Sequence, residues 1–146
     1  MNFPFELEAF IEAAGDAIIG ANAQGKITIW NPSAERIFGF TPEEALGSSL
    51  DLIIPERFRE RHWEGYRKVM LSGETRYGAD VLRVPAIHKD GRSLSIAFTV
   101  ALLRSNQRQI HTIVAIVRDE TARWHEEREL RRRLTALEMP TKSGQN

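Results

Sequence analysis

The most distinctive titratable residue is His62, which lies in a segment expected to form the longest central helix. Phe58, His62, Tyr66, Val69 and Met70 recur at helical spacing, so they share one face of that helix. Because the rest of this face is apolar or aromatic, the imidazole is expected to point toward the core. A neutral imidazole in that position can ligate iron. A single histidine on an apolar helical face is, however, more often a hydrogen-bonded core residue.

Two tryptophans accompany this face. Trp63 follows His62 directly, and Trp30 ends the second expected strand. Either ring can stack on a flavin or pack at the edge of the core, and packing is the more frequent role.

The chain has no cysteine, which excludes disulfides, thiol nucleophiles and zinc–thiolate sites. Since no nucleophile motif, phosphate-binding loop or metal-ligand spacing is found, we predict that the chain is not an enzyme.

The hydrophobic pattern predicts the elements that must position these residues. Strands are expected over residues 17–22, 26–30, 80–88, 93–103 and 109–118. Short helices are expected within residues 32–52, and longer ones over residues 56–71 and 121–138. Two strands, a helical middle and three further strands predict an α+β fold, in which a five-stranded antiparallel sheet carries helices on one face.

Residues 25–47 contain several closely spaced turn and cap signals. In order, they are a glycine turn, a strand, an Asn-Pro helix start, a Gly-Phe step and a Glu-Glu-x-x-Gly turn. Three later landmarks follow in order: Ser72-Gly73-Glu74, Lys89-Asp90-Gly91 and Arg118-Asp119-Glu120-Thr121. Together they resemble the PAS domains of sensory proteins over residues 14–121, most of the chain. The resemblance implies the PAS fold and a sensory or interaction module in signal transduction.

The resemblance also implies a ligand pocket between the central helix and the sheet. Its expected lining residues are Phe58, His62, Tyr66, Val69, Leu82, Ile96, Phe98, Val100 and Ala115. His62 matches the axial haem histidine of the rhizobial oxygen-sensing histidine kinases, so haem b is the leading cofactor and His62 its expected iron ligand. A flavin is less favoured, and the missing cysteine excludes covalent flavin photochemistry.

One position departs from the oxygen sensors. The place of their distal arginine holds Leu82, with Arg83 one residue along. A step of one residue reverses the face of a strand, so Arg83 is expected to point away from the pocket.

Asp119 and Thr121 match the Asp-x-Thr signature with which PAS sensors join the last strand to an output helix. They are therefore expected to relay a signal from the pocket. The resemblance further implies a homodimer and a separate signalling partner protein. A ligand-free PAS dimerisation or docking domain is the alternative, since side chains alone can fill the same apolar interior.

The whole chain has 146 residues and balanced charge, with 20 lysines and arginines against 20 aspartates and glutamates. This length suits one domain, and the balance favours neither nucleic acid nor a membrane surface as partner. The expected organisation is an amphipathic flanking helix over residues 1–14, the PAS domain over 15–120, an output helix over 121–138 and a disordered tail over 139–146. Without a signal peptide or a membrane span, a cytoplasmic location is expected.

Overall fold

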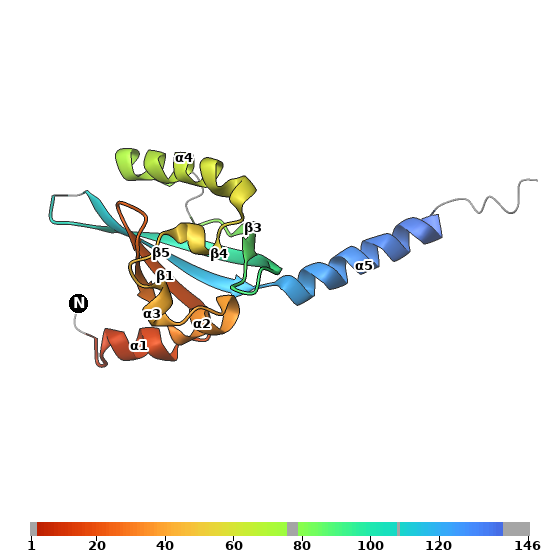
Figure 1. The fold of residues 1–146 in the computed structure, drawn as a ribbon, viewed down its shortest axis with the longest axis horizontal. Helices are drawn as coiled ribbons and strands as arrows, with labels where there is room; N and C mark the ends of the chain where they lie inside the picture. Colours follow the sequence, from red (N-terminus) through yellow and green to blue (C-terminus); the bar gives the residue numbers. More distant parts are fainter. Residues whose placement is uncertain (1–2, 76–78, 108, 139–146) are drawn as a thin grey trace, which may run out of the picture.

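The computed structural model describes residues 3–75, 79–107 and 109–138 and has the expected α+β architecture. Five antiparallel strands form one sheet in the order β2-β1-β5-β4-β3 (Figure 1). The strands are β1 (Ala17–Asn22), β2 (Ile27–Trp30), β3 (Leu82–Ile87), β4 (Ser93–Arg104) and β5 (Ile110–Asp119). Because the last strand lies between the first and the fourth, the two ends of the domain meet in the middle of the sheet.

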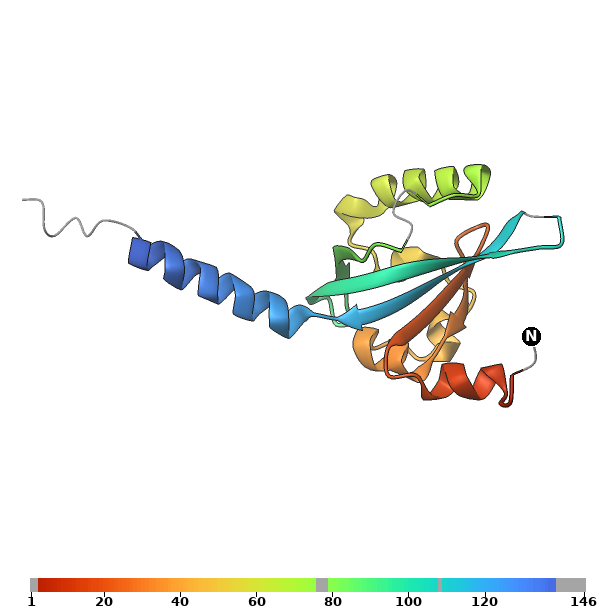
Figure 2. The ribbon, with the colours of Figure 1, turned by 180° about the vertical axis from the view of Figure 1, so that it is seen from behind.

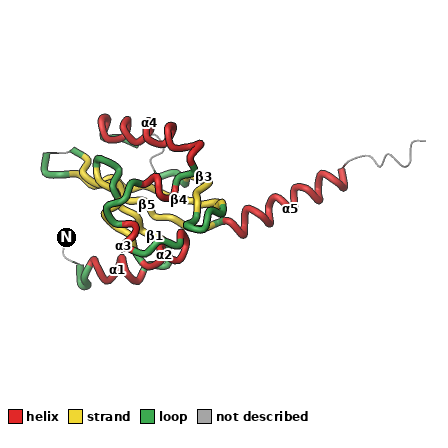
Figure 3. Tube along the Cα trace, viewed as in Figure 1, coloured by secondary structure: helices red, strands yellow, loops and turns green. Residues whose placement is uncertain are grey.

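Helices surround this sheet. They are α1 (Leu7–Ala13), α2 (Pro32–Phe38), α3 (Pro42–Ala45), the 3-10 helix η1 (Leu50–Ile53), α4 (Glu56–Ser72) and α5 (Thr121–Glu138). Figure 3 shows α1 to α4 close to the strands and α5 apart from them. Seen from both sides, α4 and α1 lie on opposite sides of the domain, while α5 projects away from it (Figures 1 and 2).

The start of α2 shows why this sequence folds locally as it does. The Asn31 side chain accepts a hydrogen bond from the Ala34 N–H, and Pro32 occupies the first helical turn, where no N–H is needed. Gly39 ends the helix with a φ of 85°, a left-handed conformation that glycine adopts without steric cost. Thr41 and Glu44 then form a reciprocal capping box that starts α3.

Asn31 also connects elements that are distant in the sequence. Its Oδ1 accepts a second hydrogen bond from the Ile18 N–H at 2.9 Å, and its Nδ2 donates to the carbonyls of Ile11 and Asp16. The side chain is 1% exposed, so its donors and acceptors are satisfied by protein alone. Asn31 thereby holds α1, β1 and α2 together.

The core lies between the sheet and the helices that follow β2. Its buried members are Ala17, Ile19, Ile27, Trp30, Ala34, Phe38, Ala45, Ile53, Ala86, Leu94, Ile96 and Val117. None of them comes from α4, whose single buried residue is Tyr66. The longest helix of the domain body therefore lies beside the main core instead of filling it.

The boundaries agree with the sequence to within two residues for the strands and for the two long helices. The helix expected over residues 1–14 is shorter, since α1 begins at Leu7, and its large apolar residues Leu7 and Phe10 are each 56% exposed. The helix expected over residues 121–138 is present as α5. The prediction of a disordered tail concerns residues outside those that the structure describes.

Candidate functional site

The inward face of α4 carries the residues that the helical spacing predicts. Tyr66 is buried, and Phe58, His62, Val69 and Met70 are half-buried, whereas most other positions of the helix are exposed. The face of α4 that the amphipathic pattern selects is therefore the less exposed face, and His62 lies on it.

Two aromatic residues fasten α4 to the hairpin formed by β1 and β2. The Tyr66 hydroxyl donates to the Asn22 carbonyl at 2.6 Å, and burial raises the pKa of Tyr66 to about 12, so the donor proton is retained. The Trp63 indole N–H donates to Asp51 Oδ1 at 2.7 Å. The Trp63 ring also covers Gly25, where an added Cβ would lie 2.2 Å from it. We call these contacts of Trp63 and Tyr66 the clamp. It requires glycine at position 25, because a side chain there would collide with the indole ring.

His62 lies beside Trp63 and Tyr66, and its imidazole is partly buried. Its Nδ1 is buried and has no hydrogen-bond partner among the described residues. The ring lies 4.7 Å from that of Trp63 and 5.7 Å from that of Tyr66. Burial lowers the pKa of His62 from its ordinary value of 6.5, and the negative charge of Asp51 offsets part of this effect. Burial therefore favours the neutral imidazole, and its Nδ1 forms no hydrogen bond with the described residues.

The predicted sheet wall lies on a single face. Leu82 pairs with Phe98 across β3 and β4, and Val100 pairs with Ala115 across β4 and β5. Ile96 is two residues from Phe98 on the same strand, so it shares that face. Ile96 belongs to the buried core, whereas Phe98, Val100 and Ala115 are only half-buried. The middle of the inner sheet face is therefore incompletely covered.

Arg83 points the other way, as expected. It pairs with Ala97, one position away from the inner-face pair, and no bulge interrupts the register of β3 and β4. Its guanidinium Nε lies 3.3 Å from Glu120 Oε2, at the start of α5. Leu82 and Arg83 therefore lie on opposite faces of β3.

The helix half and the sheet half of the predicted pocket do not pair directly. Among the described residues, no hydrogen bond or ring contact joins Phe98 to His62 or Tyr66. The contacts of His62, Trp63 and Tyr66 lead to β1, to the β1–β2 turn and to η1. Two surface grooves of the described residues lie along α5 and at its junction with β3 and β4, and neither is lined by His62, Tyr66 or Phe98.

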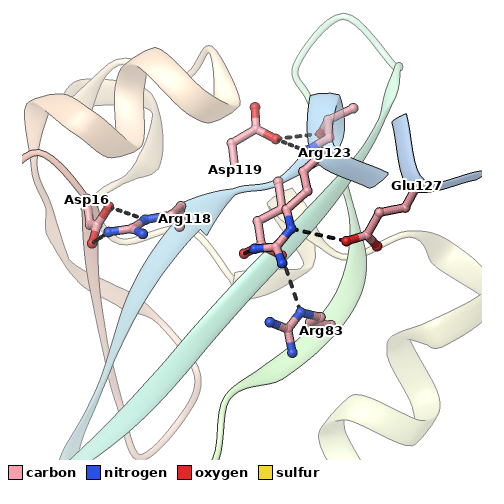
Figure 4. Close-up of polar contacts among 8 residues, drawn as sticks. Asp16, Arg83, Arg118, Asp119, Arg123 and Glu127 are labelled. Atoms are coloured by element: carbon pink, nitrogen blue, oxygen red, sulfur yellow. Dashed lines mark hydrogen bonds and ion pairs between the residues drawn. The ribbon is translucent and has the colours of Figure 1, made fainter. Parts of the chain in front are cut away.

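The junction between sheet and α5 is built from Asp119, Glu120, Thr121 and Ser95. Asp119 Oδ1 accepts hydrogen bonds from the backbone N–H and the hydroxyl of Thr121, closing a local turn before the helix (Figure 4). Thr121 Oγ1 accepts from the Ser95 N–H at 3.0 Å, and the Glu120 N–H donates to the Ser95 carbonyl at 2.8 Å. The start of α5 is therefore bonded to β4 in both directions.

Ion pairs surround the junction. Glu120 contacts Arg83 at 3.3 Å and Arg123 at 3.8 Å, so one carboxylate joins β3 to the first turn of α5. Asp16 pairs with Arg118 at 3.1 Å and so connects the residue preceding β1 to β5 (Figure 4). Sequence reasoning assigned no role to Ser95 or Glu120. Glu120 belongs to the Arg118-Asp119-Glu120-Thr121 landmark, but its residue type does not indicate contacts with β3 and β4.

A comparison with known proteins decides the family. The family model of the PAS fold matches residues 6–119, which include every strand and α1 to α4. The chain belongs to the PAS family. The recognition from sequence and the predicted fold are both confirmed. The chain contains one PAS domain and its flanking segments, and PAS domains are sensory modules of signalling proteins.

Two curated relatives are sensors. The chain is 24% identical to the oxygen sensor protein DosP of Escherichia coli over 132 residues, which are 88% of this chain and 16% of DosP. It is 34% identical to the sensor protein FixL of Bradyrhizobium diazoefficiens over 56 residues, which are 38% of this chain and 11% of FixL. The chain thus spans a small part of these two relatives, and its similarity to both is distant.

Among solved structures, the crystal structure of a PAS domain from Colwellia psychrerythraea superposes with a TM-score of 0.69 at 23% identity. The alignment covers 79% of this chain and 94% of that one. This likeness establishes the fold. Within the described part of the chain, no helix combines the length and the apolar character needed to cross a membrane.

Proposed function

We propose that this PAS domain is a sensory module that holds a small ligand between α4 and the inner face of the sheet. One observation carries the proposal: the inward faces of α4 and of β4–β5 are apolar and half-buried, yet α4 contributes nothing to the main core. Sites for small molecules are typically apolar with a few polar groups. The buried, unpartnered His62 Nδ1 supplies such a group.

The proposed output is a change at the junction of α5. Phe98 lies three residues from Ser95 on β4, and Ser95 is bonded to Thr121 and Glu120. A ligand that binds one arrangement of this strand better than another shifts the population toward that arrangement. Asp119 and Thr121 then relay the shift to α5, which has no buried residue of its own and depends on its attachment. A signalling partner that reads α5 completes the proposal.

Haem b is the leading candidate ligand, and the residues present suit it. A neutral imidazole is the form that binds iron, and burial favours this form of His62. The apolar wall suits a macrocycle: Leu82, Ile96, Phe98, Val100 and Ala115 on the sheet, with Phe58, Tyr66 and Val69 on α4. When bound, the iron would supply a binding site for a gas or a redox centre. His62 would hold it, and the apolar wall would exclude water.

The haem hypothesis is tested by adding hemin to the purified chain and recording the visible spectrum. We expect a Soret band for the wild type that is lost in His62→Ala and retained in the control His111→Ala, whose ring is exposed on β5. A band of equal intensity in both variants, or no band in the wild type, would remove His62 as an iron ligand.

The wider ligand-sensor proposal is tested by hydrogen exchange with and without a saturating ligand that copurifies or is found by screening. The expected result is altered exchange in α5 as well as in α4. Ligand binding that leaves exchange in α5 unchanged would refute transmission through the junction.

A second candidate function is a dimerisation or docking domain without ligand. A cluster of exposed aromatic rings favours it: Phe5 lies 5.5 Å from Phe3 and 6.0 Å from Phe10, and each of the three is more than half exposed. Exposed apolar clusters of this kind mark interaction surfaces. Sedimentation of the wild type and of Phe5→Ser/Phe10→Ser tests this candidate, because a homodimer formed through the cluster of Phe3, Phe5 and Phe10 dissociates in the variant; equal sedimentation of the two would refute it.

A further inference from the structure

A groove of about 560 Å³ crosses the junction between the domain and α5. Its walls come from β3, the start of β4 and the first two turns of α5, with Arg57 added from the start of α4. We infer that this groove is a second binding site, for a small organic anion that carries a carboxylate or sulfonate on an apolar body. The inference goes beyond the proposed sensory pocket, whose lining residues are different.

The charges that line the groove favour an anion. The groove is lined by three arginines, Arg57, Arg83 and Arg123, and by two carboxylates, Glu120 and Glu127. Without counting histidine, the lining residues therefore carry one excess positive charge. Glu120 is 17% exposed, whereas the side chains of Arg83 and Arg123 are 61% and 64% exposed. The acidic group therefore lies deep, and the guanidinium groups extend toward solvent.

These guanidinium groups retain capacity for another acceptor. Each has five N–H donors. Arg83 uses some of them on Glu120, and Arg123 uses some on Glu120 and on Glu127, whose Oε1 lies 3.2 Å from its Nε. Arg57 lies 4.8 Å from the ring centroid of Phe58 and forms no ion pair within the described part of the chain. A carboxylate or sulfonate can thus join the groove without displacing Glu120.

The remaining surface of the groove suits an apolar or aromatic body. Trp124 of α5 is 43% exposed, and Pro85 of β3 lines the same groove. Two polar residues, Ser93 and Ser95, also line the groove. The volume falls within the range of small-molecule sites, about 300 to 1,000 Å³.

An extended peptide suits this groove less well than a small molecule. β3 is an edge strand, the usual place for a peptide to add as a further strand. Pro85 lies in the middle of β3 and has no N–H, and a proline at an edge discourages strand addition. The occupant would contact β3, β4 and α5 together, so its binding would hold α5 against the sheet.

The experiment uses two probes of similar shape, phenylacetate and the uncharged 2-phenylethanol, titrated into the ¹⁵N-labelled full chain. The three tryptophans report separate places: Trp124 in the groove, Trp63 beside His62 and Trp30 in the core. We expect phenylacetate to shift the indole N–H signal of Trp124 with a dissociation constant of about 1 mM, typical of a fragment of this size. The alcohol should bind at least about fivefold more weakly, the factor expected for one exposed charge contact.

Matched variants assign the contact. Arg57→Gln should weaken phenylacetate binding about fivefold, because it removes a cation from the groove. Arg67→Gln makes the same change at an exposed position of α4 outside the groove and should leave binding unchanged. Equal binding of both probes, equal effects of the two variants or no shift of Trp124 would each overturn the inference. Shifts confined to Trp63 would also overturn it, while leaving the proposed pocket beside His62 standing.

Discussion

Thr121→Val tests how firmly α5 is attached to the sheet. In the wild type, Thr121 Oγ1 accepts a hydrogen bond from the Ser95 N–H at 3.0 Å and donates one to Asp119. Valine has the same shape but no hydroxyl. Two hydrogen bonds do not involve the hydroxyl and are kept in the variant. The backbone N–H of residue 121 still donates to Asp119, and the Glu120 N–H still donates to the Ser95 carbonyl. It therefore loses one of the two links between α5 and β4.

The size of the effect follows from these contacts. A hydrogen bond contributes about 0.5–1.5 kcal/mol net, and a partly buried N–H left without a partner adds to the loss, so we expect a cost of about 1–2 kcal/mol. Because α5 buries no residue, packing elsewhere on the helix cannot compensate. An opening equilibrium that shifts by this amount changes about 5- to 30-fold.

Hydrogen exchange followed by mass spectrometry measures this opening. Amides in the first two turns of α5 should exchange about 5- to 30-fold faster in Thr121→Val, while those of β1 stay unchanged. Thr135→Val is the matched control, since the one hydrogen bond of the Thr135 hydroxyl among the described residues goes to the Arg131 carbonyl within the same helix. If the two variants exchange alike, the Ser95 contact does not hold α5 and the proposed relay loses its physical basis.

Three further predictions concern the domain itself. Asn31→Ala removes four hydrogen bonds of a buried side chain and should lower the free energy of unfolding by about 3 kcal/mol or more, measured with urea; a loss below about 1 kcal/mol would contradict the connecting role. Gly25→Ala should lower the melting temperature more than Gly47→Ala, because both positions have positive φ but only the first places a Cβ against Trp63; equal losses would refute the clamp. Since burial lowers the pKa of His62 in the folded chain, the unfolded chain binds the proton more readily below pH 6.5, so stability should fall with decreasing pH. This fall should be smaller in His62→Phe, and identical pH profiles would argue against a buried imidazole.

Much of the fold was predictable because its signals are local. Asn31, Pro32 and Gly39 mark the start and end of α2 through contacts within a few residues. The spacing of Phe58, His62 and Tyr66 indicated which face of α4 turns inward, since helical geometry alone relates those positions. The one-residue offset of Leu82 and Arg83 likewise predicted opposite faces, because alternation is a property of any strand.

The contacts of the candidate site were not predictable in the same way. Tyr66 meets the Asn22 carbonyl across 44 residues of sequence, and Arg83 meets Glu120 across 37. An acceptor on the backbone leaves no trace in residue type, and a surface carboxylate resembles any other. Only the order of strands in the sheet shows that β3 and the start of α5 are neighbours.

The order of elements and the inward face of α4 follow from the sequence, since short-range geometry and turn chemistry encode both. The ordered motifs between residues 25 and 121 also carried the resemblance to PAS domains, which the family comparison confirmed. The tertiary structure alone decided that α4 is clamped to the β1–β2 hairpin, that His62 Nδ1 is left without a partner, and that α5 is bonded to β4 through Ser95. These features depend on the docking of distant segments. Docking is set by the summed packing and hydrogen bonding of the whole domain, which no local pattern contains.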